Sequence, residues 1–372
     1  MKTDIFHHVR KRRTSKISDE QQQQMQRGWF TSLTSAPGGA GQRWRWQLTL
    51  VLLFSIVLFA GSFSSAVHAQ EGGHTSIAQA QKASSLLPEG FTESFAMTNG
   101  IRMHYVSGGK GQPLVLLHGF PETWYTWHKV LPDLAKHYRV IAPDMRGAGQ
   151  TDAPSTGYDK ATMARDIHGL VSQLGLGPIN LVGHDVGLMV AYAYAALYPT
   201  NVKHLALLEA PIPDASIYTL PALTAKGPGV WWFGFFSTPQ MPEKLIQGRE
   251  AAFLTQFFQN SVPVQVQGSI TQAEIALYAH YWQNPAHLHA YISYFSSFQT
   301  DAEQIKIYGK KKLRMPVLAL GADHSLGAAV GTQVTSYATN VTGGVVTGSG
   351  HWIPEEQPQA FVDQLLAFLS KK

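Results

Sequence analysis

The pentapeptide Gly183-His-Asp-Val-Gly187 places a carboxylate between two glycines, directly after an apolar run at 179–182. Small residues on both sides of a central side chain permit the sharp strand-to-helix turn that exposes a nucleophile. A carboxylate in that position can attack an electrophilic carbon and form an ester. The same carboxylate could equally cap the helix that follows. The pentapeptide alone leaves both interpretations open, so the rest of the chain must decide between them.

A second motif supplies the hydrogen-bond donors that ester chemistry requires. His118-Gly-Phe-Pro121 follows another apolar run, at 113–117. Where a nucleophile lies at the carboxyl end of a strand, such a loop and the residue after the nucleophile provide backbone N–H groups for an oxyanion. We expect the donors to be the amides of Phe120 and Val186.

A histidine and an acid complete the set. His351 lies in a glycine-rich loop after the last expected strand, and we expect it to activate the water that hydrolyses an Asp185 ester. Two acids could orient His351: Glu209 ends an apolar strand, whereas Asp323 follows the next one. We favour Glu209, because an acid at the end of an apolar strand has no role in a core. Asp323 stays the alternative acid.

Strands that alternate with helices must position these residues. A hairpin is expected around Asn99-Gly100. Apolar patterns predict buried strands at 113–117, 138–142, 179–182, 204–208, 316–320 and 344–347, and helices at 161–174, 188–198 and 361–369. This order predicts an α/β fold with a mostly parallel central sheet and helices on both faces.

One long segment, 211–312, interrupts the alternation. It is rich in aromatic residues and contains no strong buried strand. Because a structureless loop of this length is implausible in a compact domain, we expect an inserted helical cap whose apolar face closes over the site. The chain then divides into a first core part at 91–210, the cap at 211–312 and a second core part at 313–372.

The first 69 residues form a separate unit. A long basic stretch precedes an apolar run at 48–60, and small residues follow, with Val67 and Ala69 at the −3 and −1 positions of a cleavage site. This order is typical of a secretory signal peptide, and 70–90 would be a tether. An uncleaved membrane anchor is the alternative, although the run is shorter than the ~20 residues that span a bilayer. We expect an exported protein, periplasmic or secreted.

Charge and composition exclude several classes. The net charge is +5, but residues 1–69 carry nine basic and three acidic residues, so the remainder is close to −1. That balance argues against a nucleic-acid partner, and we expect no membrane contact after the signal peptide is cleaved. The absence of cysteine excludes disulfides, thiolate metal sites and a Cys nucleophile. His280, His287 and His289 lack a matching ligand set, so no metal is expected.

With these motifs, residues 92–370 resemble the α/β-hydrolase family, and within it the epoxide hydrolases. The resemblance rests on His118-Gly-Phe-Pro121, Asp144-Met-Arg-Gly-Ala-Gly149, Gly-His-Asp185, Gly-His351-Trp and Glu209-Ala-Pro-Ile-Pro-Asp-Ala215. It implies that an epoxide is opened to a vicinal diol through an Asp185 ester, without a cofactor. It also supports Glu209 as the acid, as in a secreted bacterial member of the family.

One part of the family pattern differs. Epoxide hydrolases hold the ring oxygen with Tyr or His donors from the cap, and these positions are occupied by Trp232 and Phe295. Phe cannot donate a hydrogen bond, and an indole N–H is a weak acid. Tyr294 could substitute if the helix is rotated, as could Tyr281 or His280.

Other functions stay open for the same fold. A dehalogenase acting on a haloalkane or haloacid carbon would use the same Asp nucleophile, and Trp232 could donate to the halide. A non-enzymatic secreted binding protein is the other alternative. The aromatic cap predicts a small hydrophobic or aromatic epoxide-like substrate. The oligomeric state is open, with a homodimer as one option.

Overall fold

The computed structural model describes residues 86–225, 227–261 and 266–371. The expected signal peptide at 1–69 lies outside the described residues, as does most of the expected tether. No helix in the described part of the chain is both long and apolar enough to cross a membrane.

Within the described residues, eight strands form one sheet in the order β1-β2-β4-β3-β5-β6-β9-β10. Within this sheet, the pairs β1–β2 and β2–β4 are antiparallel and the other pairs are parallel. The turn of the first hairpin is Asn99-Gly100, and both residues have positive φ, as the sequence predicted. The strands are β1 (Phe91–Thr98), β2 (Ile101–Gly108), β3 (Pro113–Leu117), β4 (Arg139–Pro143), β5 (Ile179–His184), β6 (Val202–Leu208), β9 (Val317–Ala322) and β10 (Val341–Val346).

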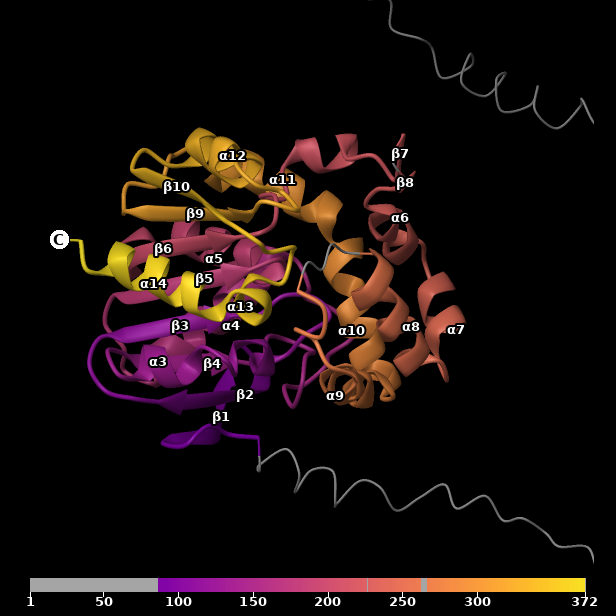
Figure 1. Cartoon of the computed structure of the whole chain (residues 1–372), viewed down its shortest axis with the longest axis horizontal. Coiled ribbons are helices and arrows are strands. Elements are labelled where there is room, and N and C mark those ends of the chain that lie inside the picture. The colour runs from indigo at the N-terminus through magenta and orange to yellow at the C-terminus, as the bar shows by residue number, and fades with distance from the viewer. Residues whose placement is uncertain (1–85, 226, 262–265, 372) are drawn as a thin grey trace, which may run out of the picture. The chain divides into compact units, whose positions relative to one another are not determined.

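Helices cover both faces of the sheet (Figure 1). Because side chains alternate along a strand, Val115 and Leu117 of β3 join one core cluster, whereas Leu114 and Leu116 join the other. The first cluster includes α4 (Lys160–Gln173), α5 (Val186–Leu197) and α12 (Ala329–Tyr337). The second includes α3 (Leu131–Ala135), α13 (Ile353–Glu356) and α14 (Pro358–Leu369). The predicted α/β architecture is therefore confirmed.

The segment between β6 and β9 forms an inserted cap, which lies to one side of the sheet (Figure 1). Its α-helices in the described residues are α6 (Trp231–Ser237), α7 (Met241–Ile246), α8 (Glu250–Gln256), α9 (Gln272–Trp282), α10 (Pro285–Ser296) and α11 (Phe298–Tyr308). A two-stranded ribbon, β7 (Leu223–Thr224) with β8 (Gly227–Pro228), precedes them. Capping residues define where two of these helices begin: Thr271 and Glu274 form a capping box on α9, and Asn284 caps α10.

Short helical turns complete the chain. They are the 3₁₀ turns η1 (Trp124–Trp127), η2 (Pro199–Asn201) and η3 (Ala215–Thr219), and the π turn η4 (Phe257–Ser261). The sequence pattern did not predict α3 or α12. Each is short, and α12 buries only Val330 and Val334, so its apolar periodicity is weak.

Buried polar contacts fasten the cap to the core. Lys160 of α4 is fully buried, and its Nζ lies 2.9 Å from the Asp301 carboxylate of α11. The same ammonium donates to the Tyr294 carbonyl at 2.6 Å. The Tyr291 hydroxyl donates to the Glu122 carbonyl at 2.8 Å. Helices of the cap are thus bonded directly to α4 and to the loop that follows β3.

Candidate active site

Asp185 lies at a sharp turn between β5, which ends at His184, and α5, which begins at Val186. Its φ of 52° is in the left-handed region, which is unfavourable for a residue with a Cβ. The turn requires glycine on both sides. A Cβ on Gly183 would lie 2.2 Å from the Gly187 carbonyl oxygen, and one on Gly187 would lie 2.2 Å from the Leu117 carbonyl oxygen.

The two carboxylate oxygens of Asp185 have different surroundings. The Phe120 N–H donates to Oδ1 at 2.8 Å. Oδ2 lies 3.7 Å from the Nε2 atom of His351. Val186 is the first residue of α5, so its N–H has no acceptor within the helix. One oxygen is therefore held by the backbone, and the other faces the histidine.

His351 is oriented from its far side by Glu209. The Nδ1 atom of the ring lies 3.4 Å from Oε2 of Glu209, which is fully buried. The other oxygen of Glu209 accepts the N–H groups of Ala322 at 2.6 Å and Leu326 at 3.3 Å. A φ of 52° turns Glu209 toward this site. Backbone donors thus hold the Glu209 carboxylate in place independently of its contact with the His351 ring.

The structure assigns Asp323 a different position. Its carboxylate accepts the N–H groups of Gly348 at 3.0 Å and Ser349 at 3.2 Å. These backbone donors lower the pKa of Asp323. Asp323 therefore supports the loop that carries His351, whereas the carboxylate that contacts the ring is that of Glu209.

A cavity of about 480 Å³ opens above these groups. Asp185, Glu209 and His351 contribute to its lining together with Phe120. Apolar side chains form most of the rest: Met189, Leu220, Val230, Phe233, Phe257, Leu326 and Val330. An apolar enclosure of this kind suits a small hydrophobic ligand whose polar atom meets the carboxylate.

The cap donor candidates separate into two groups. Trp232 of α6 and Phe295 of α10 line the cavity, but Tyr294, Tyr281 and His280 are not among its lining residues. Tyr294 is fully buried, and its hydroxyl donates to the Arg146 carbonyl at 2.7 Å.

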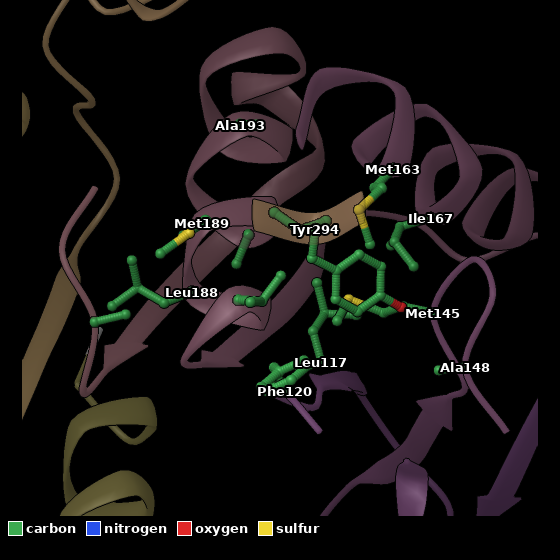
Figure 2. Close-up of a cluster of buried hydrophobic side chains, with 14 of the residues drawn as sticks. Leu117, Phe120, Met145, Ala148, Met163, Ile167, Leu188, Met189, Ala193 and Tyr294 are labelled. Carbon is green, nitrogen blue, oxygen red and sulfur yellow. The ribbon is translucent and has the colours of Figure 1, made fainter. Parts of the chain in front are cut away.

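Figure 2 shows the Tyr294 ring within the core cluster, near Met145, Met163 and Ile167. Neighbouring residues on a helix point about 100° apart, so when Phe295 faces the cavity Tyr294 faces the core. The sequence offered Tyr294 as a donor for ring opening, but its hydroxyl is bonded to the Arg146 carbonyl outside the cavity lining.

Phe120 joins the site to the cap. Its amide contacts Asp185, and its ring packs against aromatic rings from three cap helices and the π turn. The ring centroids lie 4.8–6.1 Å away, from Phe295, Phe236, Phe257, Trp282 and Tyr291. Edge-to-face contacts at such distances stabilise packing beyond the area they bury.

Three buried ionisable groups beside the site were not singled out from the sequence. They are Glu122, which directly follows the His-Gly-Phe-Pro loop, His184, which precedes the nucleophile, and Glu355 of α13. The sequence offered one signal that could have identified them: each is an ionisable residue next to one of the motifs described above. Within the described residues no cluster of three metal-ligating side chains occurs. His287 instead contacts the Gly147 carbonyl, and His289 contacts Glu243.

Comparison with known proteins fits this geometry. The model of the alpha/beta hydrolase fold family matches residues 112–358. A soluble epoxide hydrolase from Corynebacterium sp. strain C12 is 34% identical over 282 residues, covering 75% of this chain and 97% of the relative. Among solved structures, Cfl2 from Burkholderia cenocepacia is similar, with a TM-score of 0.70 and 37% identity over 75% of this chain and 96% of that one.

The Cif epoxide hydrolase from Acinetobacter nosocomialis is also similar, with a TM-score of 0.73 and 28% identity over 78% of this chain and 94% of that one. The chain belongs to the α/β-hydrolase family and, within it, to the epoxide hydrolases.

Proposed function

We propose that this protein hydrolyses an epoxide to a vicinal diol through a covalent ester on Asp185. The observation that carries the proposal is the unequal environment of the Asp185 carboxylate. Oδ1 accepts the Phe120 N–H, and Oδ2 faces His351 in an apolar cavity. A carboxylate whose free oxygen meets a hydrophobic substrate is a competent nucleophile toward a strained carbon.

The first step is attack by Oδ2 of Asp185 on an epoxide carbon. The bond between that carbon and the ring oxygen breaks, the oxygen leaves with the electron pair, and a hydroxyalkyl ester forms on Asp185. The departing oxygen then needs a hydrogen-bond donor, and it takes its proton from water. Among the cap side chains that line the cavity, Trp232 can donate through its indole N–H, whereas Phe295 cannot.

The second step hydrolyses the ester. His351 takes a proton from water at Nε2, and the hydroxide adds to the carboxyl carbon of Asp185. The oxyanion that forms on Oδ1 accepts the N–H groups of Phe120 and Val186. Glu209 stabilises the imidazolium at Nδ1, and its own position is fixed by backbone donors. Collapse of the intermediate breaks the bond between the carboxyl carbon and Oδ2, and the imidazolium returns its proton to that departing oxygen, which leaves with the diol. Loss of the remaining carboxyl proton to water restores the Asp185 carboxylate, which now contains one oxygen from water.

Trapping the ester tests the proposal. His351→Gln lacks the base for the second step, so it should gain the mass of one epoxide per chain after brief incubation, at Asp185. The matched control is the double variant with Asp185→Ala, which should gain none. Wild-type protein turned over once in H₂¹⁸O should carry ¹⁸O in the Asp185 carboxylate. If no styrene oxide or alkyl epoxide adds mass to His351→Gln, the proposed function is wrong.

Dehalogenation is a second candidate that one observation favours. A halide leaves without needing a proton, and the weakly acidic indole N–H of Trp232, which lines the cavity, can bind a halide at least as well as an alkoxide. The same His351→Gln variant offered 1-bromobutane or a haloacetate distinguishes the two activities. A binding protein without activity would retain ligand affinity and form no adduct with either class.

We also propose that the protein is exported, with a signal peptide at 1–69, a tether at 70–90 and a cap at 211–312 inserted between the two core parts. The support is the order of basic, apolar and small residues that ends at Ala69. Fractionation followed by N-terminal sequencing tests it, and a mature chain that begins at Gln70 is expected. A chain that keeps its first residues in the membrane fraction would favour the anchor.

A further inference from the structure

The cavity opens to solvent between two short segments of the chain. Four of the residues that line it are exposed, and they lie at the end of η3 and around the start of α12. These exposed lining residues are Ser216, Leu220, Leu326 and Ala329. None of them carries a charge, so the mouth of the cavity is bordered mainly by apolar groups.

The β7–β8 ribbon extends this apolar border outward. Leu223 of β7 is 77% exposed, and Tyr218 of η3 is 57% exposed. The ribbon starts at the mouth, because the Val230 N–H donates to the Pro221 carbonyl at 3.0 Å and Val230 lines the cavity. The sequence contains no acidic or basic residue from 215 to 225. A leucine this exposed on a short ribbon contributes little to the core, so it is available to a partner.

A group of exposed basic residues flanks the same mouth. Ser216 lines the cavity and also a second hollow, whose walls include Lys306 and Lys310. Ile307, between these two lysines, is 73% exposed. In Figure 1 the β7–β8 ribbon, α11 and α12 all lie in the upper part of the molecule. The basic residues of this segment, all exposed, are Lys306, Lys310, Lys311, Lys312 and Arg314.

The net charge of the chain after residue 69 conceals this local excess. That charge is close to −1, which led us to expect no membrane contact, but residues 306–314 contain five basic residues and no acid. Each lysine or arginine near an anionic membrane strengthens binding roughly fivefold. Exposed apolar side chains beside such a basic group are typical of proteins that bind at a bilayer surface. The cavity behind the mouth is itself apolar, so its ligand would also partition into lipid.

We propose that this mouth face docks on an anionic phospholipid surface and that a hydrophobic substrate enters the cavity from the lipid. Leu223 and Ile307 insert among the acyl chains, and the basic residues contact the phosphate groups. We define the mouth face as Tyr218, Leu220, Leu223, Ile307 and Leu326 with the basic residues of 306–314. Docking goes beyond the proposed function, because it concerns where the substrate comes from and involves no bond to Asp185.

Single cysteine labels test the docking, since the chain has no cysteine of its own. Leu223→Cys and Ile307→Cys are each labelled with the fluorophore NBD and mixed with vesicles of phosphatidylglycerol and phosphatidylcholine. We expect NBD emission to rise at least about twofold and to be quenched by doxyl groups on the acyl chains. Met97→Cys is the control: it is 63% exposed on β1, far from the ribbon in Figure 1, and its emission should not change.

A label reports its own surroundings, so the full-length protein can be used even if its leader binds the vesicles. The basic residues are tested in the labelled Leu223→Cys protein. Lys310→Gln combined with Lys311→Gln should raise the lipid concentration for half-maximal emission by about tenfold or more. Lys110→Gln combined with Lys136→Gln removes the same charge from exposed positions elsewhere, and it should change that concentration by less than about twofold.

Three results would overturn the proposal. They are unchanged emission from both mouth labels on anionic vesicles, an equal rise from Met97→Cys, and equal rises on pure phosphatidylcholine. Emission that rises with protein concentration in the absence of lipid would instead assign the face to contact between two copies of the chain. None of these measurements involves turnover. Failure of docking therefore leaves the Asp185 chemistry standing, and the absence of an ester in His351→Gln leaves the docking standing.

Discussion

The floor and the roof of the cavity are built in opposite ways. The floor, Asp185, Glu209 and His351, is polar, and each carboxylate is held by backbone N–H groups. The roof, Trp232 and Phe295 with their aromatic neighbours, is held by ring packing and offers an indole N–H as its side-chain donor over the floor. The difference teaches that the floor sets how an ester is formed and hydrolysed, whereas the roof sets which leaving group is tolerated.

Removing the nucleophile breaks the floor most severely. Asp185→Ala leaves no atom that can form the ester, so we expect kcat/KM to fall by about 10⁵-fold. Turnover of an epoxide, followed by diol formation, measures it. Circular dichroism of the same variant should be unchanged, since the side chain is not part of a core cluster. Residual activity near the wild-type level would show that another group attacks the substrate.

Glu209 and Asp323 provide a matched pair within the floor. Glu209→Gln loses the charge that stabilises the His351 imidazolium, so ester hydrolysis should slow by about 10²- to 10⁴-fold. Asp323→Asn only weakens the support of the neighbouring loop, and it should slow hydrolysis by less than about tenfold. Single-turnover decay of the ester is the measurement. The reverse ranking would restore Asp323 as the acid.

The attachment of the cap to the core can be broken at Lys160. Lys160→Met leaves the buried carboxylate of Asp301 without its partner, so the free energy of unfolding should fall by about 3–5 kcal/mol. The exposed pair Lys306 and Glu303 is the control, and Lys306→Met should change stability by less than about 1 kcal/mol. Urea denaturation measures both. Similar losses from the two variants would contradict a special role for the buried pair.

Adding a donor to the roof sharpens the comparison. Phe295→Tyr places a phenol donor on the cavity wall, so ring opening of an epoxide should accelerate about tenfold, or about 1.4 kcal/mol. Displacement of a halide should not change, because a halide needs no proton. Phe233→Tyr lines the same cavity from α6 and is the control. If both variants gain equally, the position is not specific.

The remaining effect concerns the dependence of stability on pH. Burial and the charge of Glu122 hold the pKa of Glu355 in the folded protein above its ordinary value of 4.5, so the folded state binds a proton that the unfolded state releases as the pH rises. The stability it contributes is full below pH 4.5 and is lost above it, at up to about 1.4 kcal/mol per pH unit. Glu355→Gln should flatten this slope in urea titrations at pH 5 and 8, whereas the exposed Glu303→Gln should not. An unchanged slope in Glu355→Gln would show that Glu355 ionises normally in the fold.

Most of the fold could be predicted from local patterns in the sequence. The apolar run at 113–117 is strand β3, and the turn around Asp185 accepts only glycine at 183 and 187, since the surroundings of both positions exclude a Cβ. The separation of Tyr294 from Phe295 could not be predicted, because it depends on how α10 is rotated about its axis, which packing against the core decides. The contact between the Glu122 carboxylate and the His184 Nδ1 atom, at 3.5 Å, was hidden for a related reason: each residue alone looks like an ordinary polar neighbour of a motif, and only β3 lying beside β5 joins them.

Phe120 has a consequence for selectivity. Its amide is bonded to the nucleophile, while its ring is surrounded by the aromatic rings of the cap. A substitution that enlarges the cavity next to this ring will move the amide as well, so the range of accepted substrates and the reactivity of the carboxylate cannot be adjusted separately. Selection for bulkier substrates should therefore favour positions away from Phe120, such as Leu220 or Val330, where the wall can recede without disturbing the chemistry.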